Sequence, residues 1–515
     1  MLSTGDLKKL KPLLRSIEEA DVVVIGGGSA GFTAACASAR SGAKTILVEA
    51  YSFLGGTTSG GLLTPMMGWR IMRYPDQAEQ FTQLFREQVT GGYATEFLER
   101  LRAVGGAWGE PNRPTTIVAT DPEAVKSVME RMLVEAGVDI WFLTQFVDVL
   151  TEGTNVSGIV VANEGALHLI WCKAAVDASG DGDLAAKSGA QFQFGRPTDS
   201  KPQPVTLSYV LGGVDFDAFL AYLKENPEEV VRHEKRIDFK QTLTPEMVEE
   251  YYRKGQPILI QGLRKATARA VENGDMPIPF GTDRPFPHVW AFPCFRSGEA
   301  RFSITQHGGD SGFGINATDR RQMAGALIAG REFARRMALF FRKYVPGFER
   351  SYLLETAPML GVRESRRIVG DYMLTEDDVR QCREFEDTIG INGCRIDIHV
   401  PDPGSRGAAS DIGAKGWYHI PYRILLPKGI EGILVAGRCV SSDHVAHGSM
   451  RHQAPCMVTG HAAGTAAAMA AQLGTTPRGL DIKALQNRLR NQGAIVDAPP
   501  LRAAPVLRPA SQQQA

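Results

Sequence analysis

The sequence predicts an α/β fold: one domain built on a parallel sheet with a small antiparallel meander, and a second, α+β domain. Residues 21–49 have the order strand, glycine-rich turn, helix and strand, which is typical of a β-α-β unit in a parallel sheet. Three β-like runs, at 146–150, 156–162 and 166–171, then precede a strand that ends at Asp177, and they predict the meander. The long segments between these pieces supply the α+β domain.

Length and composition are those of a globular protein. The chain has 515 residues, 43% apolar and 22% charged, which predicts two or three structural regions. Basic and acidic residues number 57 each, so the sequence offers no basic field to gather phosphates. Nucleic acid is therefore not expected as a partner.

We expect neither a secretory signal nor a membrane span. The first twenty residues have scattered charges, and no later window has about 18 uncharged apolar residues in a row. The seven cysteines are far apart and form no C-x-x-C pair, so we expect no disulfide framework and no metal site. A reducing cytoplasm is the simplest location.

A glycine fingerprint follows the first predicted strand, Val22–Ile25. Its pattern, G-x-G-x-x-G, comprises Gly26, Gly28 and Gly31. Glycines at these places let backbone N–H groups approach a pyrophosphate at the positive end of a helix. The turn is therefore expected to bind a dinucleotide, with Ser29 and Ala30 in the first turn of the helix.

The second predicted strand, Thr45–Val48, ends at Glu49, whose carboxylate can accept hydrogen bonds from a ribose diol and disfavours a 2′-phosphate. A second glycine-rich stretch, LGGTTSGG, follows and contains Gly55, Gly56 and Thr57. Such a stretch can pass close to a long, flat cofactor, whereas a simple NAD domain has no obvious use for it. The sequence thus favours FAD over NAD.

Further along, Asp121 and a proline open a helix that Gly137 closes, and a strand at 140–143 precedes the meander. In the other domain, apolar residues at helical spacing predict a helix over 319–344, stopped by Pro346 and the glycine after it. A substrate is expected where this domain covers the flavin ring.

Together these motifs resemble the bacterial FAD-dependent oxidoreductase family of the glutathione-reductase-like superfamily. The matching segments are VVVIGGGSAG, LGGTTSGG, VDASGDGDLAAKSGA, QPVTLSYVLGGVD, GVRESRRIVGDYMLTEDDV, YHIPYRILLP and ILVAGRCVSSDHVAHGSMRHQAPCMVTGHAAGTAAA, within about residues 20–493. The resemblance implies a split Rossmann-like FAD domain, bound FAD and a distant similarity to fumarate-reductase-like flavoproteins. Family members act on diverse substrates, so it implies no particular one.

The expected organisation follows from the order of these segments. It comprises an N-terminal extension (1–20), three segments of the FAD-binding domain (21–61, 119–190 and 431–473), a cap insertion (62–118), a substrate or cap domain (191–430), a C-terminal helix (474–496) and a flexible tail (497–515).

The resemblance also implies that the C-terminal part returns to the cofactor. Residues 433–436 would form the last strand, and a helix beginning near Gly460 would direct its positive N-terminus at the N1–C2=O edge of the flavin. The further cofactor contacts that it implies are Val147, Ser179, Gly180, Gly437, Arg438, Gly460, Ala463 and Gly464.

One dinucleotide fingerprint is present and a C-x-x-x-x-C redox pair is absent, which favours direct hydride exchange with a small-molecule substrate. Oxygen, a quinone or a partner protein would be the other electron carrier. Dehydrogenation of a small hydroxylated, amino or carboxylated compound is favoured. The alternatives are reduction of an activated C=C bond, hydroxylation by a flavin monooxygenase, a tRNA-modifying flavoprotein and a non-enzymatic flavin carrier.

The segment at 441–464 carries four histidines and an arginine directly before an alanine-rich run. Hydride loss from carbon needs a base for the neighbouring O–H or N–H proton, and a cation can hold a carboxylate or an oxyanion. His447 and Arg451 match a His-Gly-x-x-Arg pattern of fumarate-reductase-like flavoproteins and are the first candidates. They could instead only bond the flavin or brace a loop. The further catalytic candidates are His444, His307 and Tyr422.

The five residues 363–367, RESRR, allow three interpretations. They could hold an anionic substrate, bind the FAD pyrophosphate, or form a structural network of ion pairs.

The FAD is expected to be bound non-covalently. In succinate-dehydrogenase-like relatives a histidine after the ribose-binding acid is linked to the flavin, but residues 52–65 contain neither histidine nor cysteine. Acid precipitation should therefore leave the yellow colour in the supernatant. Colour that stays with the pellet would contradict this prediction and would point to Cys439 or Cys456.

Overall fold

The structure, a computed structural model, describes residues 2–3, 11–71, 88–108, 118–229, 244–253, 260–277, 289–293, 298–305, 314–401, 408–410, 412–413 and 415–497. The predicted tail lies outside these residues except for Asp497, and so does His307.

A central sheet of eight strands organises the first domain. Its order is β1 (Leu2–Ser3), β8 (Gln145–Glu152), β9 (Asn155–Asn163), β10 (Ala166–Asp177), β2 (Leu14–Ile25), β3 (Thr45–Val48) and β7 (Asp139–Trp141), and β22 (Ile433–Val435) also pairs with β10. Strands β22, β10, β2, β3 and β7 are parallel, whereas β8, β9 and β10 form the antiparallel meander. The predicted α/β fold with a parallel sheet and a meander is confirmed.

The first strand begins earlier than the sequence predicted. Residues 14–20, which the sequence placed in an N-terminal extension, are the first half of β2 and pair with β10. Exposed and partly buried residues alternate along this half, as in a strand with one face in water, and no continuous apolar run marks it. The buried run at 22–25 is only the inner half of the strand.

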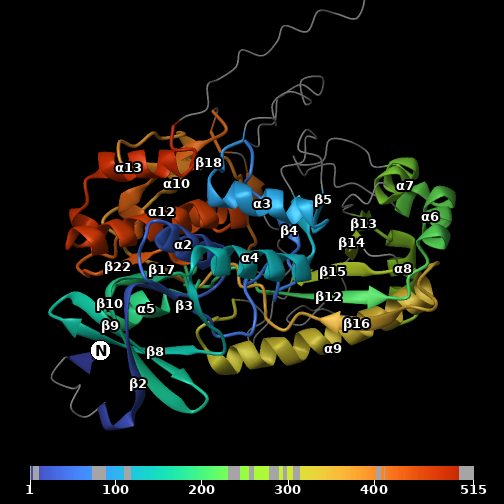
Figure 1. The fold of residues 1–515 in the computed structure, drawn as a ribbon. Helices are drawn as coiled ribbons and strands as arrows, with labels where there is room; N and C mark the ends of the chain where they lie inside the picture. Colours follow the sequence, from blue (N-terminus) through green and yellow to red (C-terminus); the bar gives the residue numbers. More distant parts are fainter. Residues whose placement is uncertain are drawn as a thin grey trace, which may run out of the picture.

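Two helices pack against each other and lie on one side of this sheet (Figure 1). They are α2 (Ser29–Arg40) and α12 (Gln453–Leu473). A side chain at Gly460 or Gly464 would overlap the carbonyl oxygen of Ala30 or Ala34, respectively, so the two backbones touch. The hydroxyl of Thr33 also donates to the carbonyl of Met457 at 2.9 Å.

The second domain is built on a five-stranded antiparallel sheet. Its order is β13 (Ile260–Gly262), β14 (Val289–Pro293), β15 (Ala300–Thr305), β12 (Thr206–Gly212) and β16 (Tyr352–Thr356). Helix α9 (Arg320–Tyr344) packs against it, and the smaller helices are α6 (Phe216–Glu225), α7 (Pro245–Arg253) and α8 (Arg264–Glu272). Figure 1 shows this α+β part beside the central sheet, and the long helix predicted over 319–344 is confirmed.

The remaining elements connect or cover these two sheets. The helices are α3 (Tyr93–Ala103), α4 (Pro122–Ala136), α5 (Asp183–Lys187), α10 (Glu376–Arg380), α11 (His444–Met450) and α13 (Ile482–Asn491). The strands are β4 (Pro65–Met66), β5 (Ala107–Trp108), β6 (Val118–Thr120), β11 (Phe192–Phe194), β17 (Arg366–Ile368), β18 (Thr388–Asn392), β19 (Ile396–Ile398), β20 (Ala408–Ser410) and β21 (Tyr418–Pro421). Within the described ranges, no helix is both long and apolar enough to span a bilayer.

Local signals for helix ends are confirmed. Asp121 accepts hydrogen bonds from two backbone N–H groups at the start of α4, and Gly137 ends that helix in the left-handed conformation.

The domain boundary predicted at residue 430 does not match the packing. Buried side chains before it, such as Ile368, Ile389 and Leu426, belong to the core of the central sheet. That core is assembled from distant segments, so the sequence gives no composition change at its edge.

One histidine in α12 is buried and forms no ion pair with any described residue. His461 is 3% exposed, its Nε2 lies 2.9 Å from Oε1 of Gln492, and its ring packs on Tyr93. Burial lowers the pKa of His461 to about 4. The neutral ring is therefore part of the packing between α12, α13 and α3.

This burial predicts acid sensitivity. Unfolded histidine takes up a proton below about pH 6.5, whereas folded His461 resists protonation down to about pH 4. The free energy of unfolding should thus fall as the pH is lowered from about 6.5 to about 4. His461→Gln keeps a donor for Gln492 but has no proton to take up. In this variant the decrease in the free energy of unfolding between about pH 6.5 and about pH 4 should be smaller by about 1–3 kcal/mol, as measured by urea titration at several pH values. An identical pH dependence in parent and variant would contradict the prediction, and His168→Gln on β10 is the control.

Candidate active site

Four parallel strands end at one edge of the central sheet. β2 ends at Ile25, β3 at Val48, β10 at Asp177 and β22 at Val435. Ligands of open α/β sheets bind beyond the carboxyl ends of such strands. The segments that directly follow these strands contain most of the cofactor residues predicted from the sequence.

Two fingerprint glycines are required by the protein itself. Gly26 has φ +95°, and a Cβ there would lie 2.5 Å from the carbonyl oxygen of Ala178. A Cβ at Gly31 would overlap the carbonyl oxygen of Gly26. These glycines therefore allow the tight turn between β2 and α2.

The middle glycine is different. Gly28 has φ −70°, and the nearest atom to an added Cβ would be Cα of Gly56, 3.9 Å away. Neither its backbone conformation nor the surrounding protein atoms require a glycine. The space left beside it fits a group that approaches the backbone from outside the protein.

The N-terminus of α2 lies at this space. No side chain of the described residues caps it, and its first turn carries no acidic residue. The N–H groups of Ser29 and Ala30 there add to the partial positive charge of the helix end. An anion at this point would satisfy them.

Glu49 is held in place by the backbone. Its Oε2 accepts from the N–H of Gly27 at 2.6 Å, and its Oε1 accepts from the N–H of Tyr51 at 2.9 Å. Burial raises the pKa of this carboxyl. Each oxygen keeps a lone pair with which it could accept from a ribose hydroxyl.

The second glycine-rich stretch lies against the first. A Cβ at Gly56, which has φ +51°, would come within 3.1 Å of Cα of Gly28. Gly55 has φ +99°, and the carbonyl of Thr57 accepts from the N–H of Leu63 at 3.0 Å. The two stretches thus bring bare backbone to both sides of the position next to Gly28.

The loop after β10 meets the loop after β22. The hydroxyl of Ser179 donates to Asp177 at 2.7 Å, and Gly180 faces the guanidinium of Arg438. Arg438 pairs with Asp181 at 2.9 Å and donates to the hydroxyl of Ser365 at 2.7 Å. The buried carboxyl of Asp177 has its pKa raised to about 6 by desolvation.

Gly437 closes this group of loops onto α2. It has φ +80°, its N–H donates to the hydroxyl of Thr459 at 2.9 Å, and a Cβ there would lie 2.8 Å from Cβ of Ala30. Val147 lies half-exposed on β8, and its predicted cofactor contact stays a prediction.

The prediction that the last helix begins near Gly460 is wrong. α12 begins at Gln453, after the N-cap His452, and Pro455 is tolerated because it falls in the first turn. Gly460 and Gly464 are small because α2 touches them, and Ala463 is buried in the same helix. The positive helix end therefore lies beside the preceding arginine, Arg451.

His447 projects from the short helix α11, whose N-terminus Asp443 caps. Its Nε2 lies 3.1 Å from the carbonyl oxygen of Arg438 and must donate to it, which leaves Nδ1 as an acceptor. Nδ1 is buried, and no described residue donates to it. Burial, reinforced by the charges of Arg367 and Arg451, holds the pKa of His447 well below its usual range, so the ring is neutral at pH 7.

A buried carboxylate organises the neighbouring side chains. Glu364 accepts from Nδ1 of His444 at 2.9 Å, from the guanidinium of Arg367, and from the N–H of Gln203 at 3.0 Å. Its side chain is fully buried. The RESRR segment thus contributes a structural network, in which Arg366 also pairs with Asp183 at 2.7 Å.

Arg451 is bound to the β19 strand. Its Nη2 donates to the carbonyl oxygen of Asp397 at 2.8 Å and to Oδ2 of Asp397 at 3.1 Å. Nε2 of His399 lies 3.4 Å from the same Oδ2. Sequence reasoning missed Asp397, His399, Gln203 and the individual role of Glu364, because no spacing in the sequence relates these separate segments.

Tyr422 is removed from the candidates. It is 1% exposed, and its hydroxyl donates to the carbonyl oxygen of Pro477 at 2.9 Å. Its neighbours are apolar core residues, which explains why an aromatic residue stands there. His307 lies outside the described residues, so its role stays a prediction.

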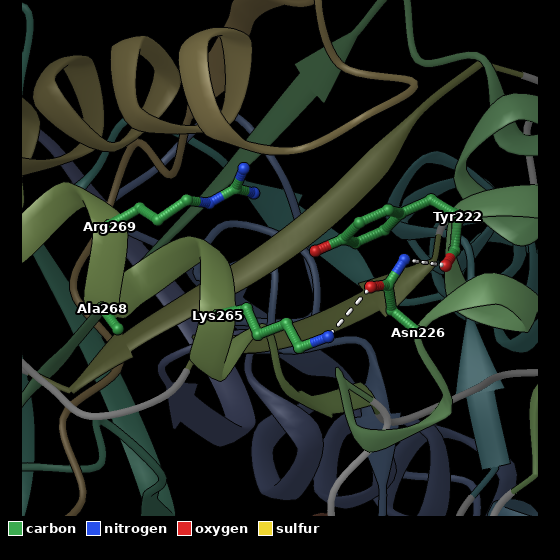
Figure 2. Close-up of a pocket in the computed structure, with 5 residues that line it drawn as sticks. All are labelled: Tyr222, Asn226, Lys265, Ala268 and Arg269. Carbon is green, nitrogen blue, oxygen red and sulfur yellow. Dashed lines mark hydrogen bonds between the residues drawn. The ribbon is translucent and has the colours of Figure 1, made fainter.

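A surface pocket of about 360 Å³ lies in the cap between α6 and α8 (Figure 2). Lys265 crosses it to donate to Asn226 at 3.1 Å and also pairs with Glu228. Tyr222 and Arg269 line its other sides. Lys265 is thus already paired, Arg269 donates to the carbonyl of Tyr344 at 3.4 Å, and the strand ends described above contribute nothing to the lining.

Comparison with known proteins decides the family. The model of the FAD dependent oxidoreductase family matches residues 21–489. The chain belongs to this family. This FAD-dependent oxidoreductase is an enzyme whose cofactor is FAD, as the sequence predicted.

Individual relatives are distant. A thiamine thiazole synthase from Aeropyrum pernix is 30% identical over 159 residues, which are 30% of this chain and 47% of the relative, so the match spans about half of that protein. Two solved structures show only broad similarity. A geranylgeranyl bacteriochlorophyll reductase-like protein from Thermoplasma acidophilum has 13% identity and a TM-score of 0.42, and p-nitrophenol 4-monooxygenase from Pseudomonas putida has 11% and 0.44. Each covers 93% of this chain and 85% of its own.

The residues at the strand ends fit FAD. The uncapped N-terminus of α2 and the space beside Gly28 suit a pyrophosphate, and Glu49 suits a ribose. Gly437 and Arg438 line the same edge. Bound there, FAD supplies the redox chemistry.

Two alanine substitutions separate binding from folding. Gly28→Ala should leave the stability of FAD-stripped protein unchanged, because the new Cβ meets only an atom 3.9 Å away. It should weaken FAD binding about 10–100-fold by disturbing one charge-assisted hydrogen bond of about 1.5–3 kcal/mol. Gly31→Ala should instead lower the melting temperature, since its Cβ overlaps Gly26. Thermal melts and fluorescence titration with FAD measure both effects.

Gly325→Ala on α9 is the matched control, because nothing lies within 4 Å of its added Cβ. Unchanged FAD affinity in Gly28→Ala would refute the assignment of the pyrophosphate position.

Proposed function

We propose that this flavoprotein dehydrogenates a small polar substrate, with hydride transfer to the flavin and proton transfer to His447. The observation that carries the proposal is the buried Nδ1 of His447, an acceptor to which no described residue donates. An O–H or N–H group of the substrate is the donor that suits it. The proton must leave that group as hydride leaves the neighbouring carbon.

The surrounding residues support this role. The bond from Nε2 to the Arg438 carbonyl fixes the ring orientation and the tautomer of His447. Arg438 belongs to the loop after β22, at the sheet edge that fits FAD, so this bond ties the histidine to the loops proposed to bind the cofactor. Arg451, one helical turn further on, supplies a positive charge for a carboxylate or an oxyanion.

Reduction of a C=C bond is less well supported. That reaction needs a proton donor beside the substrate. The neutral ring of His447 has a single N–H, and this N–H already donates to the Arg438 carbonyl.

We also infer a cytoplasmic location. The six cysteines that the structure describes are all free and buried. A reducing compartment suits a protein of this size with that pattern.

The proposal predicts the behaviour of His447 variants. His447→Gln and His447→Ala should stay yellow, because FAD is held by other residues, but flavin reduction by an active compound should slow about 10²–10⁴-fold. A panel of hydroxy acids, alcohols, amines and amino acids is screened anaerobically for flavin bleaching, and single-turnover stopped flow then gives the rate.

His168→Gln is the control, since that histidine lies on the sheet beside Ser16. Equal reduction rates in the His447 variants and the parent would eliminate His447 as the base. His444, which Glu364 orients, would then be the next candidate.

A further inference from the structure

We propose that the substrate is a small carboxylic acid whose oxidised O–H or N–H group lies on the carbon next to the carboxylate, and that Arg451 and Gln203 bind this carboxylate. The inference rests on the proposed function for the place of His447. It adds a substrate class, 2-hydroxy or 2-amino acids, and two residues that select it.

Buried donors point to a missing acceptor. Nη2 of Arg451 is bound to Asp397, whereas its Nε is buried and has no acceptor among the described residues. The amide nitrogen of Gln203, a residue with no exposed surface, also lacks an acceptor within the described part of the chain. Each buried unsatisfied donor costs about 1–3 kcal/mol, so a ligand oxygen that fills these positions is favoured.

The two donors belong to one continuous set of side chains. Oε1 of Gln203 accepts from the N–H of His399 at 3.1 Å, and the ring of His399 lies 3.4 Å from Asp397. Asp397 in turn holds Arg451 at 3.1 Å. These contacts hold both side chains through other atoms, so Nε of Arg451 and the amide nitrogen of Gln203 stay available to a ligand.

The local charge favours an anion. Arg363 is partly buried, donates to the carbonyl of Pro204 at 2.6 Å and lies near enough to Arg451 to be repelled by it. Desolvation and this repulsion lower the pKa of Arg363 to about 9, and the attraction of Asp397 offsets them only in part. Glu364 cannot relieve the repulsion, because it is engaged by Arg367 and His444. A carboxylate at Arg451 would offset it.

The spacing selects the substrate class. His447 and Arg451 are separated by one helical turn, since the N–H of Arg451 donates to the carbonyl of His447 at 3.1 Å. Side chains at this spacing start about 5–6 Å apart and can converge on one small molecule. One carboxylate oxygen can accept a charge-assisted hydrogen bond from Nε of Arg451, and a hydroxyl or amine on the adjacent carbon can then reach Nδ1 of His447.

Binding of an anion would also prepare the base. The charges of Arg367 and Arg451 lower the pKa of His447 and so weaken it as a base. A carboxylate beside Arg451 offsets part of that charge and raises the basicity of the ring. An uncharged alcohol would leave His447 a weak base, so selection of the substrate and activation of the base depend on one contact.

The test uses the FAD-loaded protein and non-reacting as well as reacting probes. Propionate, lactate and alanine are compared with propionamide, lactamide and alaninamide by calorimetry and by flavin difference spectra. We expect the acids to bind about 10–100-fold more tightly than their amides. Arg451→Gln should raise the Kd of the acids about 10–100-fold and leave the Kd of the amides unchanged.

Three further variants keep the test interpretable. Arg451→Gln takes the arginine away from Asp397, and the unpaired carboxylate would destabilise the site. The double variant Arg451→Gln/Asp397→Asn removes both charges and should show the same loss of acid binding. Arg423→Gln, at an exposed pair with Asp387, removes an arginine of matched chemistry outside the site and should change neither affinity. Gln203→Leu should weaken acid binding by about tenfold.

Equal affinity for acids and amides, or unchanged acid binding in both Arg451 variants, overturns the inference. If neutral alcohols or amines bleach the flavin and acids neither bind nor inhibit, the inference fails while dehydrogenation stands. A third outcome is that acids bind through Arg451, do not reduce the flavin, and only an unsaturated acid reoxidises the reduced enzyme. The enzyme would then reduce a C=C bond, so the inferred carboxylate contact would stand and the proposed dehydrogenation would fail. Lactate and alanine separate the hydroxy-acid and amino-acid forms of the substrate.

Discussion

The site depends on the backbone contact between α2 and α12. Gly460 and Gly464 let α12 lie directly on the carbonyls of Ala30 and Ala34, and Thr33 bonds across the contact. One of these helices presents its N-terminus to the pyrophosphate position, and the other begins next to Arg451. A single close contact therefore sets the distance between the uncapped end of α2 and the segment that carries His447 and Arg451.

Much of the fold could be predicted because its signals are local. The order of strand, glycine turn and helix at 21–49 depends on neighbouring residues, and so do the helix ends at Asp121 and Gly137. The sequence did not predict the first half of β2. One face of this half is exposed to water, so polar residues interrupt the apolar run that would mark a buried strand. The start of α12 was misplaced because small residues suit a flavin and a helix contact equally well, and only the position of α2 distinguishes the two.

The candidate site could be predicted only in part, for a related reason. His447 and Arg451 lie in one short segment, and their spacing is visible in the sequence. Asp397, which binds Arg451, and Glu364, which binds His444 and the backbone of Gln203, come from other segments, and only the folded chain brings them together. The protonation state of His447 could not be predicted from the sequence either. Burial and the neighbouring arginines lower its pKa and keep the ring neutral, and both effects arise only in the folded chain.

Gln203 stands just before β12, the strand through which the chain enters the cap sheet. Its side chain and backbone nevertheless bond to His399 and Glu364, which lie outside that sheet. The start of the cap sheet is thus tied to this polar network through a residue whose amide nitrogen has no acceptor within the described part of the chain. A substitution of Gln203 would therefore disturb two places at once, the entry to the cap sheet and the polar network around Glu364 and His399.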